Sequence, residues 1–130
     1  MENKSVDVYL HHIQDAINRI ERFMRGVRKE DFFSDDSMVS AAVVREFEII
    51  GEAIAQTPDE FREKHTMIPW RAIIDMRNRL IHNYFSIDYG IVWKTASEDL
   101  PELKKQIEEL IKDNKEIYPP SMAKCLVELG

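Results

Sequence analysis

Apolar residues recur every three or four positions over most of the chain, which is the period of a helix with one buried face. The first such stripe predicts a helix over residues 5–24, ended by Gly26. Its members are Val6, Leu10, Ile13, Ile17, Ile20 and Met24. A second stripe predicts a helix that begins near Ser37, a suitable N-cap. Its members are Val39, Val43, Phe47, Ile50 and Ile54.

Two local features qualify this pattern. Gly51 lies in the middle of the second predicted helix, where glycine costs about 1 kcal/mol relative to alanine. We interpret that cost as a sign that another helix packs closely at this position. Residues 28–36, before the second helix, are mostly polar and predict a connection in which Phe32 and Phe33 pack against the core.

Prolines and cap residues predict the remaining helices. Thr57 and Pro58 have the pattern of an N-cap followed by a first-turn proline, which predicts a short helix over residues 58–65. Pro69 in the same way opens a third main helix that extends to His82 or Tyr84.

The fourth main helix is predicted to begin after Asp88, which can cap it, and to contain a kink. Its apolar stripe comprises Val92, Ala96, Leu103, Ile107 and Leu110. Pro101 lies inside this helix and removes the hydrogen bond to the carbonyl of Ser97, so the helix should bend there. The predicted fold is all-α, an antiparallel bundle of four main helices plus a short helix. Residues 1–115 would form this domain, and residues 116–130 an extension, because Tyr118-Pro119-Pro120 cannot continue a helix.

Composition narrows the classes of function. A chain of 130 residues with a net charge of −6 is large enough for one domain, and RNA would have to bind at a local basic patch. Cys125 is the single cysteine, which excludes an intrachain disulfide and a cysteine-based zinc site. His11 and His12 are adjacent and lack the spacing of a metal pair, so we expect no metal and no cofactor. Neither a signal peptide nor an apolar run of membrane-spanning length is evident, which predicts a cytoplasmic protein.

The third predicted helix carries an arginine on its apolar stripe. Arg77 shares a face with Trp70, Ile73 and Tyr84, although burial of an unpaired guanidinium is costly. Three explanations compete at this point. Arg77 pairs with a buried carboxylate such as Glu48 or Glu52 of the second helix, or its charged end reaches solvent, or it lines a binding site for an anion.

His82 lies five residues beyond Arg77, which places it about 140° around an ideal helix. It falls instead on a polar face with Asp75, Asn78 and Arg79, of which Asp75 and Arg79 have the spacing of a surface ion pair. An exposed histidine at a helix end is the ordinary interpretation of this position. Arg77 and His82 can converge only if the helix ends near Ile81 or if two copies of it meet across a dimer interface.

A site that combined these residues would have a definite chemistry. An imidazole can accept the proton of a ribose 2′-hydroxyl or donate one to the leaving 5′-oxygen. An arginine can hold the phosphate and stabilise the charge that accumulates on it. Asn78 could orient either group by a hydrogen bond. Such a site requires RNA and no metal, and with a twofold axis through it one histidine could act as the base and its mate as the acid.

The residues from Arg77 to Tyr84 resemble the Arg-x4-His-x-Tyr motif of HepT-like toxins in the HEPN superfamily. Asn78 supplies the polar residue that commonly follows the arginine. The resemblance extends over roughly residues 5–113 and includes three flanking blocks in the right order. These blocks are Ile50-Gly51-Glu52-Ala53, Ile68-Pro69-Trp70 and Asp99-Leu100-Pro101-Glu102-Leu103.

This resemblance implies a helical homodimer in which the two motifs line a shared cleft. It also implies metal-independent endoribonuclease activity, with Arg77 and His82 as catalytic residues. A minimal nucleotidyltransferase antitoxin of the MntA type is the implied partner. In the family this partner transfers AMP onto the motif tyrosine, which is Tyr84 here, and silences the nuclease. The segment after Asp113 lies beyond the matched part.

Two other classes of function remain open from the sequence. The chain could be a non-catalytic HEPN subunit that binds a nucleotidyltransferase or a nucleotide, which the acidic net charge favours and the presence of His82 disfavours. It could also be a plain helical dimerisation module, but that function leaves Arg77 on the apolar stripe unexplained.

Overall fold

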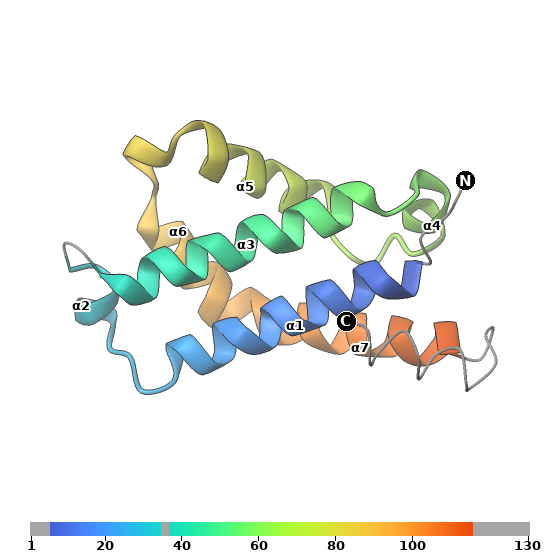
Figure 1. Ribbon diagram of the computed structural model, residues 1–130, viewed down its shortest axis with the longest axis horizontal. Coiled ribbons are helices and arrows are strands. Elements are labelled where there is room, and N and C mark those ends of the chain that lie inside the picture. The colour runs from blue at the N-terminus through green and yellow to red at the C-terminus, as the bar shows by residue number, and fades with distance from the viewer. Residues whose placement is uncertain (1–5, 35–36, 116–130) are drawn as a thin grey trace.

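Four long helices form the body of the molecule in the computed structural model, which describes residues 6–34 and 37–115 (Figure 1). They are α1 (Val6–Met24), α3 (Met38–Gln56), α5 (Trp70–His82) and α7 (Leu100–Lys115). Successive long helices run in opposite directions, with α3 between α1 and α5 and α7 beside α1. The predicted all-α bundle of four main helices is therefore confirmed. The predicted extension over residues 116–130 lies outside the described residues.

Three shorter helices connect the long ones. They are α2 (Lys29–Phe32), α4 (Asp59–Lys64) and α6 (Tyr89–Lys94). Residues Tyr84–Ser86 add a 3₁₀ turn after α5. The short helix predicted for residues 58–65 is α4, whereas α2 was expected to be an irregular connection.

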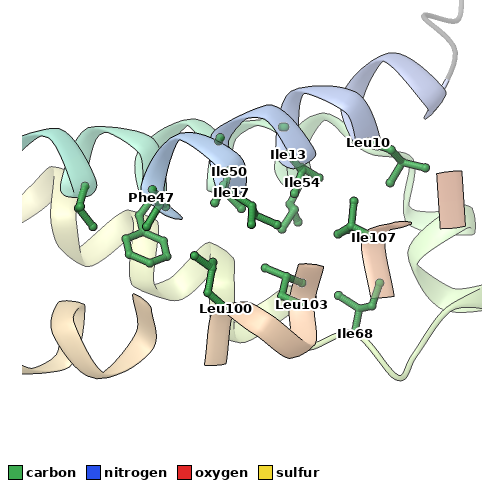
Figure 2. Packing of buried hydrophobic residues seen from close by; sticks show 14 of the residues in the cluster. Leu10, Ile13, Ile17, Phe47, Ile50, Ile54, Ile68, Leu100, Leu103 and Ile107 are labelled. Carbon is green, nitrogen blue, oxygen red and sulfur yellow. The ribbon is translucent and has the colours of Figure 1, made fainter. Parts of the chain in front are cut away.

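The core forms where the apolar stripes of α1, α3 and α7 face one another (Figure 2). Ile13 and Ile17 of α1 and Ile50 of α3 are fully buried. Opposite them lie Leu103 and Ile107 of α7. Full burial of side chains of this size contributes about 1.5–3 kcal/mol each. The pairing of these helices is therefore fixed by the stripes that the sequence predicted.

α3 and α5 approach each other closely at Gly51. A Cβ atom placed on Gly51 would lie 2.3 Å from Cβ of Arg77 and 2.5 Å from its Cγ. The prediction that another helix packs closely here is confirmed, and that helix is the one that carries the arginine. The missing side chain of Gly51 thus sets the position of Arg77.

Helix caps bear out two of the predictions and correct one. Ser37 caps α3 by accepting a hydrogen bond from the backbone N–H of Ser40 at 3.1 Å. Asp88 caps α6 by accepting from Gly90 and Ile91. Thr57 is not the N-cap of α4, because α3 continues to Gln56 and the hydroxyl of Thr57 donates to the carbonyl of Ala53 at 2.9 Å. Pro58 occupies the N-cap position instead.

Just before Pro101, where a kink was expected, the chain forms a π-helical turn. Residues Thr95–Asp99 form this turn between α6 and α7, and the N–H of Leu100 bonds to the carbonyl of Thr95, five residues earlier. Val92 and Leu100 are both buried, although eight residues of ideal α-helix would leave them about 80° apart. Because a π turn holds one more residue than an α turn, it brings both side chains onto the same core.

One aromatic residue of the connection before α3 departs from the prediction. Phe32 is buried and its ring lies 5.1 Å from that of Trp93. Phe33 was also expected to pack against the core, but it is 42% exposed. It follows the end of α2 and lies at the border of the core, where its ring is 6.4 Å from that of Trp93.

Candidate active site

Arg77 projects from α5 over Gly51 toward the carboxylate of Glu52 on α3. Its Nη2 donates a hydrogen bond to Glu52, and its Nη1 donates to the side-chain oxygen of Asn78 at 2.7 Å. The Nε of Arg77 is buried and has no hydrogen-bond partner within the described part of the chain. The predicted ion pair with Glu52 is confirmed, and Asn78 is the group that orients the guanidinium.

Glu52 is more exposed than the sequence suggested. Its side chain is 54% exposed, against 22% for Arg77, so the expectation of a buried carboxylate is wrong. Gln56 also donates to Glu52, at 3.1 Å. The hydrogen bond from Arg77 is the main reason that the pKa of the Glu52 carboxyl lies below its ordinary value, and the bond from Gln56 adds to it. Glu52 is therefore an anion at neutral pH, and in this form it holds the guanidinium of Arg77.

His82 is the last residue of α5, and its side chain is exposed. The helix runs without a break from Arg77 to His82, so the two side chains point about 140° apart. The helix ends after His82 and not before it, so its end does not bring the two side chains together. Within one chain the structure does not unite the two predicted catalytic residues.

The polar face of α5 also differs in detail from the prediction. Asp75 pairs with Arg71 on the preceding turn, where Nε and Oδ1 are 3.4 Å apart, rather than with Arg79. Tyr84 begins the 3₁₀ turn that follows α5. Arg79 and Asp75 instead border a separate cleft described below.

A small pocket, here named the Arg77 pocket, lies between α1, α3 and α5. Its volume is about 290 Å³. The lining residues are Tyr9, His12, Arg45, Glu48, Ile49, Glu52, Ala53, Gln56, Arg77 and Ile81. The contribution of α1 was not predicted, and the one available signal was the spacing of Tyr9 and His12, which puts both on one helical face.

A larger cleft of about 1010 Å³ lies on the other side of α5, between this helix and α6 and α7. Apolar residues such as Ile73, Leu80 and Leu103 line it. Its charged lining residues are Asp75, Arg79, Asp88, Glu98, Asp99 and Glu102. Five carboxylates against one arginine give this cleft a negative charge, which repels anions such as phosphate.

Comparison with known proteins decides the family. The profile of the family described as "Ribonuclease HepT-like" matches residues 13–110, which include all of α3 and α5. The chain belongs to the HepT-like ribonuclease family. The resemblance inferred from the motif around Arg77 and His82 is thereby confirmed, and the HEPN superfamily agrees with the helical fold.

Several relatives of this HepT-like chain bear ribonuclease names. A protein of Caldanaerobacter subterraneus subsp. tengcongensis, named "Putative RNase", is 46% identical over 108 residues, which cover 82% of this chain and 95% of the relative. A protein of Thermococcus cleftensis, named "Probable ribonuclease HepT", is 46% identical over 104 residues, or 80% of this chain and 94% of the relative. No solved structure matches the chain.

Family membership confirms the predicted enzyme class, because the family is one of ribonucleases. No helix among residues 6–34 and 37–115 of this HepT-like chain is both long and apolar enough to cross a membrane. The same residues contain no group of three or more His, Cys, Asp or Glu side chains placed to hold a metal ion.

Proposed function

We propose that this HepT-like chain is a cytoplasmic toxin, a metal-independent endoribonuclease that cleaves RNA by attack of the 2′-hydroxyl. It would act as a homodimer in which Arg77 of one protomer and His82 of the other meet at one phosphate. A nucleotidyltransferase antitoxin of the MntA type would silence it by transferring AMP onto Tyr84. Residues 1–115 would carry the catalytic domain, with residues 116–130 as an extension of undefined role.

The unbroken course of α5 is the observation that supports the dimeric site. Arg77 is already ordered by Glu52 and Asn78, whereas His82 is exposed and points to a different side of the same helix. An exposed histidine is available to a second molecule. In a symmetric dimer the helix ends of the two chains can approach one another, so that each histidine faces the arginine of its mate.

The proposed reaction uses these groups in a defined order. The imidazole of His82 accepts the proton of the 2′-hydroxyl, whose oxygen attacks the adjacent phosphorus. The guanidinium of Arg77 stabilises the added negative charge on the phosphate oxygens. The bond from phosphorus to the 5′-oxygen then breaks, and this oxygen takes up the proton held by the imidazolium of His82. The products are a 2′,3′-cyclic phosphate and a 5′-hydroxyl.

Silencing by AMP transfer has a simple electrostatic basis. Tyr84 follows the end of α5 by two residues, beside the catalytic motif. An added phosphodiester brings negative charge and bulk to this position. It would compete with the RNA phosphate for Arg77 and obstruct the approach of a second chain.

RNA cleavage by the purified protein in EDTA is the primary test. The expected products carry 2′,3′-cyclic phosphate ends, and His82→Ala and Arg77→Ala should each abolish cleavage without changing the far-ultraviolet circular dichroism. Arg79→Ala removes a cation from another face of the same helix and should leave cleavage largely intact. Loss of activity in EDTA, or full activity in His82→Ala, would contradict the proposed mechanism.

Mixing two inactive variants tests whether the site is shared between chains. After joint refolding of Arg77→Ala with His82→Ala, about half of the dimers contain one of each chain, and each of these keeps one complete site. The mixture should therefore recover about a quarter of the wild-type activity. No recovery would contradict a site built from two chains, as would a monomer in sedimentation.

The modification of Tyr84 has its own assay. Incubation with ATP and a nucleotidyltransferase of the MntA type should raise the intact mass by one or more AMP units. Tyr84→Phe should remain unmodified and remain active. A modification that maps to Tyr9 or Tyr89 would show that the assignment to Tyr84 is wrong.

A further inference from the structure

We propose that the Arg77 pocket is a base-binding subsite, which holds the nucleobase next to the phosphate bound by Arg77 and stacks it on the aromatic rings of Tyr9 and His12. This inference rests on the proposed function, because it assigns to that site a specific contact with RNA. It adds α1 to a site otherwise built from α3 and α5.

The two rings provide the first argument. Tyr9 is half-buried against the core, while His12 one turn later is exposed. Their ring centroids lie 6.5 Å apart and the ring planes are nearly perpendicular, at 84°. A flat base that stacks on one ring therefore meets the other at its edge, and aromatic side chains of this kind commonly hold unpaired bases of RNA.

The size and polarity of the pocket provide the second argument. Its volume of about 290 Å³ is at the lower limit of ordinary ligand sites, which span about 300–1,000 Å³, so it has room for a single nucleoside. The amide of Gln56 and the carboxylate of Glu48 line it beside the apolar Ile49 and Ile81. Amide and carboxylate groups can both hydrogen-bond the polar edge of a base.

The charges of the pocket favour a base inside it and a phosphate at its border. Arg45 pairs with Glu48 at 3.7 Å, and Arg77 pairs with Glu52. These opposite charges leave the interior close to neutral, which suits an uncharged ring. Arg77 can reach a phosphate at the edge while the attached nucleoside enters, whereas the acidic cleft beyond Arg79 repels the strand.

A comparison of normal and abasic RNA tests this subsite. The substrate is a short RNA whose cut position has been mapped, together with two versions that lack the base on the 5′ or the 3′ side of the cut. For the wild type, the abasic version that lacks the base held in the subsite should have a KM about tenfold higher than the normal RNA. Stacking of one base on one aromatic side chain changes binding by about this factor. His12→Ala combined with Tyr9→Leu should raise KM by a similar factor for the normal RNA and should leave KM for that abasic version unchanged.

Controls separate the subsite from other causes. Tyr89→Leu removes a partly exposed ring on α6 and should change neither KM value. His12→Ala alone, at an exposed position, carries the test if the variant of Tyr9 does not fold. If removal of the base and removal of the rings each raise KM and the two factors simply multiply, the base does not stack on these rings and the subsite is overturned. The proposed function would still stand in that case, because RNA is cleaved. Absence of cleavage of any RNA by the wild type would overturn both.

Discussion

Replacing Gly51 by alanine should destabilise the protein, although glycine-to-alanine changes inside helices usually stabilise. The new Cβ would lie 2.3 Å from Cβ and 2.5 Å from Cγ of Arg77. These two atoms are fixed close to the backbone of α5, so rotation of the arginine side chain cannot relieve the overlap. The helices α3 and α5 must separate instead.

The two opposing effects can be compared in magnitude. Forcing extra atoms into a packed contact costs about 1–3 kcal/mol, and a contact this short belongs near the upper limit. The gain in helix propensity from glycine to alanine is about 1 kcal/mol. The net loss in the free energy of unfolding should therefore be about 1–2 kcal/mol. This corresponds to a fall of roughly 4–8 °C in the unfolding temperature.

Thermal and urea unfolding at one fixed protein concentration would measure the effect of Gly51→Ala. Ala41→Gly is the matched control, because this residue is exposed on the same helix and should lose up to about 1 kcal/mol through propensity alone. RNA cleavage by Gly51→Ala should also fall, because the displacement of α5 moves Arg77 away from Glu52. A variant that is about 1 kcal/mol more stable than the wild type would refute the close contact between the helices.

Three further predictions concern stability and can be checked by urea unfolding. Ile17→Ala, at a fully buried position, should cost about 2–5 kcal/mol, and a loss below 1 kcal/mol would contradict the packing of α1. Ser37→Ala removes the cap of α3 and should cost about 0.5–2 kcal/mol, while an unchanged midpoint would argue against the cap. Glu52→Gln should cost less than about 1 kcal/mol at neutral pH, because the Glu52 side chain is more than half exposed. Since Arg77 lowers the pKa of Glu52, this difference should be complete above the ordinary value of 4.5 and should disappear as the pH falls through the lowered pKa. A difference that persists in full at still lower pH would exclude the ion pair as its cause.

Local signals predicted the helices well because caps and apolar stripes act over a few residues. Ser37 and Asp88 cap the helices that they were expected to cap. Thr57 shows the limit of such signals. The Thr-Pro-Asp sequence has the pattern of an N-cap, but the previous helix reaches Gln56, and a hydroxyl at its end can bond backward to Ala53 equally well. The choice between these bonds depends on packing, which no local pattern records.

The candidate site was predictable only where it lies on one helix. Periodicity placed Arg77 and His82 on different faces of α5, as the structure has them. Glu52 was one of two carboxylates named for an ion pair with the arginine, and that pair was one of three explanations left open. The exposure of the Glu52 side chain was not predicted, because it depends on which face of α3 the neighbouring helices cover. The contribution of Tyr9 was also missed, because it depends on α1 packing beside α3, a contact between distant parts of the chain.

The π turn over Thr95–Asp99 gives this chain one position at which its length can change without rearrangement of the bundle. Deletion of one residue from the turn would restore ordinary α-helical hydrogen bonding, so the local backbone would tolerate it. Val92 and Leu100 would then lie seven residues apart, which leaves their side chains only about 20° from one another on an ideal helix. Leu103 and Ile107 would therefore keep their places in the core. Sequences that share this bundle should include some that lack one residue between Val92 and Leu100 and have an ordinary α-helix in place of the π turn.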